Sequence, residues 1–270
     1  MEKNARARLL LAVTAVVGGM TGVAGAQQAT LLNQNFDSLP LGPFVSTTES
    51  GGTGSDWTDV PPAGWTRDNS GVPEGPPPEF RGFTFMNKES WVATEGNQDR
   101  FLFGRGTGTV MVADPDAFDD GTEIDPNLFH PTITTPAIAL GGVQPNSLVL
   151  NFSSSFRPYD TMTARVNVKF GNGPFTNILE YNTSNSGGNS NEMRIDEDVT
   201  LNVVNPAGAT SAQFQFELAD AGNDWWWAVD NLLVKGTVPE PAGAALLGFG
   251  LAALARRTRK HPPTDAPGRD

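Results

Sequence analysis

Cysteine is missing from all 270 residues of the chain. Its absence excludes disulfide bonds, a thiol nucleophile and any Cys-ligated zinc or iron–sulfur site. Histidine is almost missing too, since only His130 and His261 occur. A His-rich zinc site and a mechanism that uses two histidines are therefore excluded. Stability beyond ordinary packing would have to come from a bound metal.

Basic residues are scarce: 18 Lys and Arg face 30 Asp and Glu, for a net charge of -12. This balance argues against nucleic acid as a partner, because phosphate binding needs a positive surface. Cations and neutral ligands fit better. The 38% of apolar residues can build a real core, and 30 glycines with 21 prolines indicate a turn-rich, all-β chain.

The first 26 residues have the pattern of a secretory signal peptide. Lys3, Arg6 and Arg8 precede the apolar run 9–17, and small residues at 24–26 supply a cleavage site before Gln27. We expect signal peptidase to cleave there, so that the mature chain begins near Gln27. A retained N-terminal anchor is the alternative.

The C-terminal region has three parts in a fixed order. A Pro-Glu-Pro tripeptide comes first, then an apolar run, then a basic cluster; the residues are Pro239, Glu240, Pro241, the run 242–255, Arg256 and Arg257. This order resembles the PEP-CTERM sorting signal of bacterial exported proteins. The resemblance implies an exosortase as processing partner and a location at the cell surface or in the extracellular matrix, including a biofilm matrix.

The apolar run also predicts a transient membrane anchor. Its 14 residues span about 21 Å as a helix, shorter than a hydrocarbon core of about 30 Å. Snorkelling of the arginines that follow can close part of this gap. A basic cluster after an apolar helix stays in the cytoplasm, so the preceding body lies outside. A buried amphipathic helix is the alternative interpretation.

Residues 27–236 read as one domain, followed by a linker and the sorting segment 237–270. Short β-prone runs bounded by turn residues fill this domain, which predicts a β-sandwich. We expect strands at 30–36, 91–94, 108–112, 133–138, 147–156, 162–170, 177–181, 198–204, 213–218 and 225–234. Long loops are expected at 42–81 and 113–131. Without its two ends, the body carries ten basic and 26 acidic residues.

The closing segment 221–234, with its three consecutive tryptophans, resembles the last strand of jelly-roll sandwiches in concanavalin-like, MAM-like and carbohydrate-binding domains. Asn35-Phe36-Asp37 near the start fits the same plan. The resemblance implies a jelly-roll β-sandwich but no single activity, because these families differ in function.

Two groups of acidic residues are candidates for calcium. One loop places six carboxylates within twelve residues, and calcium accepts six to eight oxygen ligands from such loops; they are Asp114, Asp116, Asp119, Asp120, Glu123 and Asp125. A solvated acidic loop is the alternative. By resemblance to jelly rolls that hold a structural calcium near their terminal strands, Asp37 and Asp230 form the second group.

Two groups of residues are candidates for glycan binding. Alternation along a strand places Trp225 and Trp227 on one face and Trp226 on the other, so one indole is expected to be exposed beside Asn223 and Asp224. A planar aromatic ring flanked by polar groups suits a sugar. Core packing of all three indoles is the alternative. The second group follows the strand 147–156 and consists of Arg157, Tyr159 and Asp160.

The sequence therefore predicts an exported, surface-sorted, non-catalytic protein of the extracellular matrix that binds glycans such as extracellular polysaccharide. No Gly-x-Ser-x-Gly elbow or phosphate-binding loop occurs in the chain. Two other classes stay open: a structural matrix protein without a specific ligand, and a glycan-active hydrolase.

Overall fold

Antiparallel strands joined by turns make up most of the described chain, as the sequence predicts. The computed structural model describes residues 26–45, 52–94, 98–119, 128–159, 161–183, 193–222 and 224–239. They belong to one unit, Ala26–Pro239, which ends three residues beyond the expected boundary. The expected signal peptide and the C-terminal helix lie outside the described residues.

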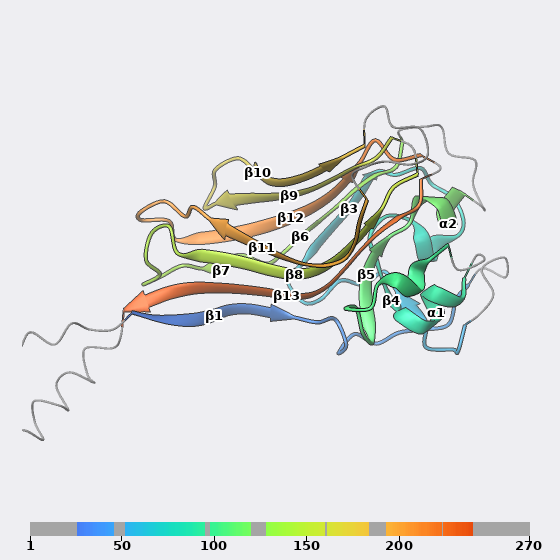
Figure 1. Cartoon of the computed structure of the whole chain (residues 1–270), viewed down its shortest axis with the longest axis horizontal. Helices are drawn as coiled ribbons and strands as arrows, with labels where there is room; N and C mark the ends of the chain where they lie inside the picture. Colours follow the sequence, from blue (N-terminus) through green and yellow to red (C-terminus); the bar gives the residue numbers. More distant parts are fainter. Residues whose placement is uncertain are drawn as a thin grey trace, which may run out of the picture. The chain divides into compact units, whose positions relative to one another are not determined.

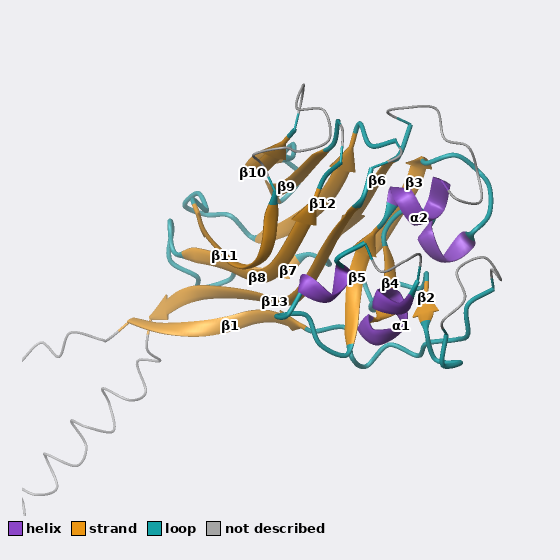
Figure 2. Ribbon diagram, turned by 45° about the vertical axis from the view of Figure 1, so that its right-hand side comes forward, coloured by secondary structure: helices purple, strands orange, loops and turns teal. Residues whose placement is uncertain are grey.

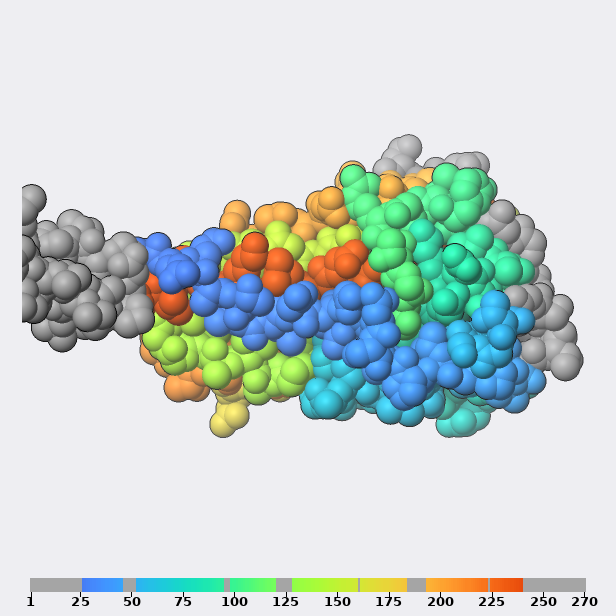
Figure 3. Space-filling view, turned by 90° about the horizontal axis from the view of Figure 1, so that it is seen from below, coloured from blue at the N-terminus to red at the C-terminus, as the bar shows by residue number. Residues whose placement is uncertain are grey.

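The first of two sheets has seven strands and contains both ends of the described chain. Its order is β11 (Arg194–Val203), β8 (Leu148–Arg157), β13 (Trp226–Pro239), β5 (Thr109–Ala113), β4 (Thr84–Asn87) and β2 (Trp57–Thr58). The seventh strand, β1 (Ala26–Gln34), pairs with the later half of β13, from Gln34 opposite Leu232 to Ala26 opposite Pro239. Figure 1 shows these two strands side by side, and Figure 3 shows β1 in blue along the surface next to β13.

The second sheet has six strands and lies against the first (Figure 1). Its order is β10 (Thr176–Asn182), β9 (Thr163–Phe170), β12 (Ser211–Ala219), β6 (His130–Thr134) and β3 (Thr66–Gly71), and β7 (Ile138–Ala139) also pairs with β12. Strand β12 alternates between buried and partly exposed side chains, which gives it one core face.

Aromatic rings join the two sheets. Phe216 of β12 lies edge-on to Phe152 of β8, with ring centroids 5.4 Å apart. It also packs against Trp227 of β13 at 5.7 Å. These contacts, together with the buried aliphatic residues around them, define one continuous core. The result is the jelly-roll-like β-sandwich that the sequence predicts.

A small helical layer covers part of the outer face of the seven-stranded sheet. It comprises η1 (Pro78–Phe80), α1 (Lys88–Ala93), η2 (Arg100–Leu102) and α2 (Pro115–Asp119). Figure 2 shows these helices in purple gathered beside β4 and β5, at the end where β13 begins. We call this layer the cap.

A buried ion pair holds the cap together. Arg100 of η2 and Asp114, both fully buried, are 2.9 Å apart. The indole N–H of Trp91 in α1 donates to the same carboxylate at 2.9 Å. Arg100 also donates to the carbonyl and hydroxyl oxygens of Thr94, so its charge is both paired and hydrogen-bonded, as burial requires.

Three expectations about the chain are wrong here. Residues 91–94, expected as a strand, belong to α1 and its end, because the Asn87 side chain accepts the Ser90 N–H and caps a helix. The expected loop 42–81 contains β2, β3 and η1, and the expected loop 113–131 contains α2 and the first residues of β6. Strand β4 was not expected either.

We predict that Trp226→Ala lowers the free energy of unfolding by about 3–5 kcal/mol, because the side chain is fully buried between sheet and cap. Its ring lies 5.0 Å from that of Trp91 at an interplanar angle of 87°. Urea unfolding followed by circular dichroism measures the change. Trp225→Ala serves as the control and is expected to cost less, because Trp225 is only partly buried. An equal loss in both variants would contradict this packing.

Candidate functional site

The structure brings four of the predicted glycan-binding residues together at the start of β13. Arg157 ends β8 opposite Trp226, and Trp225 precedes β13 directly. The Arg157 guanidinium lies over the Trp225 ring at 3.6 Å from its centroid. The Tyr159 ring stacks on Trp225 with centroids 5.6 Å and planes 27° apart. We call Arg157, Tyr159, Asp224 and Trp225 the Trp225 cluster.

Hydrogen bonds to Asp224 fix the backbone of the Trp225 cluster, and its two aromatic rings are partly exposed to solvent. The buried Asp224 carboxylate accepts the backbone N–H groups of Tyr159, at 3.2 Å, and Gly222, at 3.3 Å. These bonds tie the β8 end to the β13 start. Tyr159 is 47% exposed and Trp225 is partly exposed. The cluster therefore presents an aromatic surface to solvent on a fixed backbone.

Trp226 and Trp227 do not contribute to this surface, which corrects the expectation that placed them with the ligand. Both are fully buried. The Trp227 N–H donates to the Ser154 hydroxyl at 3.0 Å inside the sandwich, and Trp226 lies under the cap. Alternation does send them to opposite faces, as predicted, but the cap covers the second face as well. Asn223 and Asp160 lie outside the described residues.

Sequence reasoning missed the contribution of the cap to the cluster. Asp99 pairs with Arg157 at 2.5 Å and is about half exposed. Two residues further, Phe101 is an exposed aromatic side chain of η2. The Nε of Arg157 is buried without a hydrogen-bond partner among the described residues. Asp99 lies 58 positions before Arg157, so no local pattern could have linked them.

The acidic run 114–125 does not form a metal centre among the residues that the structure describes. Asp114 forms an ion pair with Arg100 and accepts the indole N–H of Trp91, as described above. Asp116 accepts from the Gln98 amide, and Asp119 ends the short helix α2. Asp120, Glu123 and Asp125 lie outside the described residues. Over the described ranges, no group of three or more His, Asp or Glu side chains is placed to hold a metal ion.

Asp37 and Asp230 come close together, as predicted, although they are distant in sequence. Asp37 accepts the Thr109 N–H at 2.9 Å, and Asp230 accepts the Thr107 N–H at 3.0 Å. Burial, reinforced by the negative charge of Asp37, raises the pKa of Asp230 to about 6. The Lys88 ammonium partly offsets this effect while it donates to the Gly106 carbonyl at 2.8 Å.

The donors at this pair fit calcium only in part. Two carboxylates and nearby carbonyl oxygens are the right chemistry, but calcium takes six to eight oxygen ligands. Both Asp230 oxygens already accept backbone N–H groups, and Lys88 already places a cation close by. Calcium binding stays a prediction at both groups of residues.

A polar network covers the outer face of the six-stranded sheet, and sequence reasoning did not single it out. Glu217 of β12 lies 2.7 Å from the His130 ring and 3.4 Å from Arg165, which binds Glu180 at 2.8 Å. Asn167 donates to Glu217 at 2.9 Å. The hydrogen bond to Glu217 raises the pKa of His130, and the same bond lowers the pKa of Glu217.

The last residues of β13 belong to the C-terminal pattern that the sequence singled out. Residues 237–260 match the PEP-CTERM protein-sorting motif. The chain is therefore an exported, surface-sorted protein whose motif implies processing by an exosortase. The motif begins inside the fold, since Thr237, Val238 and Pro239 pair with Gln28, Gln27 and Ala26. Glu240, Pro241, Arg256 and Arg257 lie outside the described residues.

Comparison with solved structures shows distant similarity of fold. The K1 cleaved adhesin domain of Lys-gingipain from Porphyromonas gingivalis W83 is 16% identical over 66% of this chain and 94% of its own, with a TM-score of 0.43. TmCBM61 in complex with β-1,4-galactotriose is 8% identical over 64% and 88%, with a TM-score of 0.37. A cyclase from Fischerella sp. TAU is 11% identical over 80% and 100%, with a TM-score of 0.44.

Identity and TM-score are too low for these likenesses to indicate a function. No curated protein sequence is significantly similar to the chain. Over the described ranges, no helix is both long and apolar enough to cross a membrane.

We predict that the His130–Glu217 contact makes stability depend on pH. Because the folded pKa of His130 is raised, its contribution is fully present below the ordinary value of 6.5 and is lost as the pH rises through the folded value. The free energy of unfolding, measured by urea titration over this interval, is expected to fall less steeply in His130→Asn and Glu217→Gln. Equal slopes in wild type and both variants would refute the pairing.

We also predict that calcium raises the melting temperature of the protein if the folded state alone binds it. The comparison is between chelator and millimolar calcium by scanning calorimetry. Asp37→Asn should abolish the shift if the Asp37–Asp230 pair is the site, whereas Asp119→Asn should abolish it if the acidic run is. An unchanged melting temperature in the wild type rules out a stabilising calcium site at either place.

Proposed function

We propose that this exported, surface-sorted protein acts without catalysis in the extracellular matrix, where its Trp225 cluster binds a neutral glycan chain. One observation carries the proposal: the partly exposed stack of Tyr159 on Trp225, next to Arg157 and Asp99. Aromatic surface of this kind packs against the apolar face of a sugar ring, while a few fixed polar groups orient its hydroxyls.

The charges around the stack support a neutral ligand. Arg157 is neutralised by Asp99, and the body as a whole is strongly acidic. An anionic polymer would meet repulsion here. The half-exposed Asp99 carboxylate has lone pairs left to accept hydroxyl groups. We therefore assign hydroxyl recognition to Asp99 and ring stacking to Tyr159 and Trp225.

Binding suits the cluster better than hydrolysis does. Glycoside hydrolysis needs one carboxyl group that donates a proton and a second that acts as base or nucleophile. Here Asp99 is paired with Arg157, and Asp224 is committed to the backbone N–H groups of Tyr159 and Gly222. Both carboxylates are therefore already engaged within the protein, and among its described residues the cluster offers no second carboxyl group for the pair that hydrolysis needs.

Before its processing, the protein is held at the membrane by the apolar run 242–255, and the exosortase then acts at the Pro-Glu-Pro tripeptide. The order of the sorting motif supports this stage. The basic cluster that follows the run keeps the C-terminus on the cytoplasmic side, so that the sandwich lies outside.

We predict that Tyr159→Ala abolishes glycan binding and leaves the melting temperature nearly unchanged, because a half-exposed ring contributes little to the core. Tyr159→Phe keeps the stacked ring and should keep most of the binding. Phe175→Ala is the matched control: a partly exposed ring that lies under Lys169 and outside the cluster. A glycan array followed by calorimetric titration of the hits measures all four proteins.

Retained binding in Tyr159→Ala would remove the cluster as the binding site. A wild-type protein that binds nothing on the array would instead favour a structural matrix protein. Turnover of a bound polysaccharide by the wild type would favour a hydrolase and overturn the non-catalytic assignment.

A further inference from the structure

The end of the sandwich from which the sorting motif continues has an unusual composition. Three loops meet there, 140–147, 171–175 and 204–210, together with the strand ends 26–31 and 235–239. We call these five segments the sorting end. In Figure 1 the end of β13 and the start of β1 lie at this end, opposite the cap.

Hydrogen bonds hold these segments in one surface. Thr237 receives the Gln144 N–H at its carbonyl oxygen, at 2.8 Å, and donates its own N–H to the Ser147 hydroxyl at 3.1 Å. The Asn205 side chain bonds the Gln144 carbonyl and the Ser147 N–H, both at 2.9 Å. Gly171 donates to Ser211 at 3.0 Å. These hydrogen bonds connect the segments of the sorting end, so that the loops do not stand independently.

Charge is distributed unevenly between the two ends of the sandwich. The sorting end contains no acidic residue, although the body between the two targeting segments has 26. Its cation is Lys235, and Lys169 near the end of β9 adds a second one beside the sorting end, since it lies over the ring of Phe175 in the loop 171–175. The cap end instead holds Asp116 and Asp119, together with Asp99 and Asp114, which are paired with Arg157 and Arg100. Glu240, the next acidic residue along the chain, lies outside the described residues.

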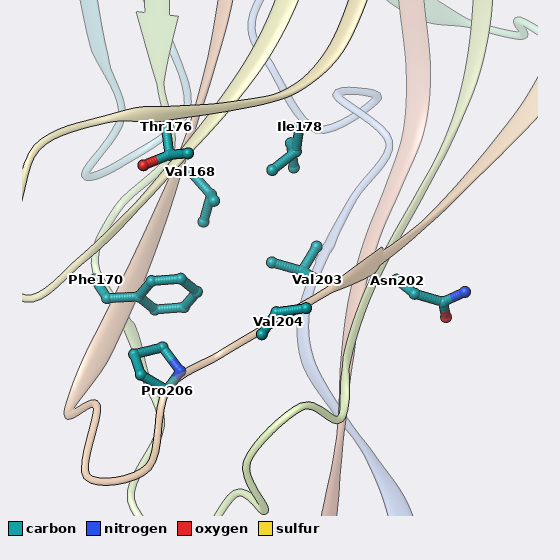
Figure 4. Close-up of a pocket in the computed structure, with 8 residues that line it drawn as sticks. All are labelled: Val168, Phe170, Thr176, Ile178, Asn202, Val203, Val204 and Pro206. Atoms are coloured by element: carbon teal, nitrogen blue, oxygen red, sulfur yellow. The ribbon is translucent and has the colours of Figure 1, made fainter.

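An apolar pocket of about 440 Å³ opens at the sorting end. It lies between the edge strands of the two sheets, with β9 and β10 on one side and the end of β11 on the other. Figure 4 shows Val168, Phe170 and Ile178 facing Val203, Val204 and Pro206, while Asn202 points away. Val204 is 74% exposed, which is a large exposure for an apolar side chain next to an apolar pocket.

We propose that the sorting end is a docking surface for an anionic lipid bilayer during the membrane-held stage of sorting. The apolar run 242–255 begins three residues after Pro239, so this end of the sandwich is the part nearest the bilayer while the run is inserted. Lysines attract anionic headgroups. The exposed Val204 and the pocket beside it supply apolar surface for the interface.

The inference rests on the proposed membrane stage and adds an orientation to it. Docking through the sorting end turns the Trp225 cluster away from the membrane. Strand β13 has 14 residues, and at about 3.3 Å per residue it separates the two ends by about 45 Å. The glycan site then faces the matrix rather than the lipid.

The absence of cysteine from the chain makes the test direct, because a single introduced thiol can be labelled alone. The full mature chain carrying Val204→Cys is labelled with an environment-sensitive fluorophore and incorporated into vesicles of phosphatidylcholine, with or without phosphatidylglycerol. Val60→Cys, another exposed valine that lies just after β2 near the cap, is the matched control. Lys169→Glu combined with Lys235→Glu tests the charge in the Val204→Cys background.

Emission from Val204→Cys is expected to shift to shorter wavelength, with several-fold less quenching by iodide than Val60→Cys, in phosphatidylglycerol vesicles only. The double lysine variant should lose this protection while its melting temperature stays the same. Equal quenching at both positions in protein that floats with the vesicles would overturn docking and leave the membrane stage standing. Equal protection of Val204→Cys from iodide in vesicles with and without phosphatidylglycerol would also overturn docking to an anionic bilayer. Protein that fails to float with the vesicles refutes the membrane stage itself.

Discussion

The buried ion pair between Arg100 and Asp114 is the interaction on which the cap end depends. It joins η2 to the segment after β5 and also binds Trp91 of α1. Loss of one partner from such a pair costs about 3–5 kcal/mol, because the other charge is left buried. With the pair intact, the cap covers Trp226 and positions Asp99 beside Arg157. The composition of the Trp225 cluster therefore depends on an ion pair that lies outside the cluster.

The sequence was sufficient to predict the sandwich because its strands carry their own signals. Burial alternates along β12 and along the first residues of β8, and turn residues separate the strands. The sorting motif is likewise local, which is why residues 237–260 could be recognised from order alone. Arg157, Tyr159 and Trp225 could be proposed as a site because each stands at a strand end.

The cap could not be predicted in the same way. Its helices are at most six residues long, too short to show a helical period, and one turn of α1 replaces an expected strand. The burial of Trp226 depends on Trp91, which is 135 positions away in the sequence, so alternation alone overestimated its exposure. The same limit applies to Asp99 and to the His130–Glu217 contact, whose partners meet only after folding.

Strand β13 also determines how the protein carries load. A force applied between the Trp225 cluster and Pro239 would act along the axis of β13, because the cluster lies at the first residues of the strand and Pro239 at its end. Strand β8 runs antiparallel to β13 and ends just before Tyr159, so a pull on Tyr159 against Pro239 would load the ladder between the two strands in shear. In shear, many hydrogen bonds must break together, whereas peeling breaks them one at a time. The longest strand of the sheet thus connects the Trp225 cluster to the start of the sorting motif along one line.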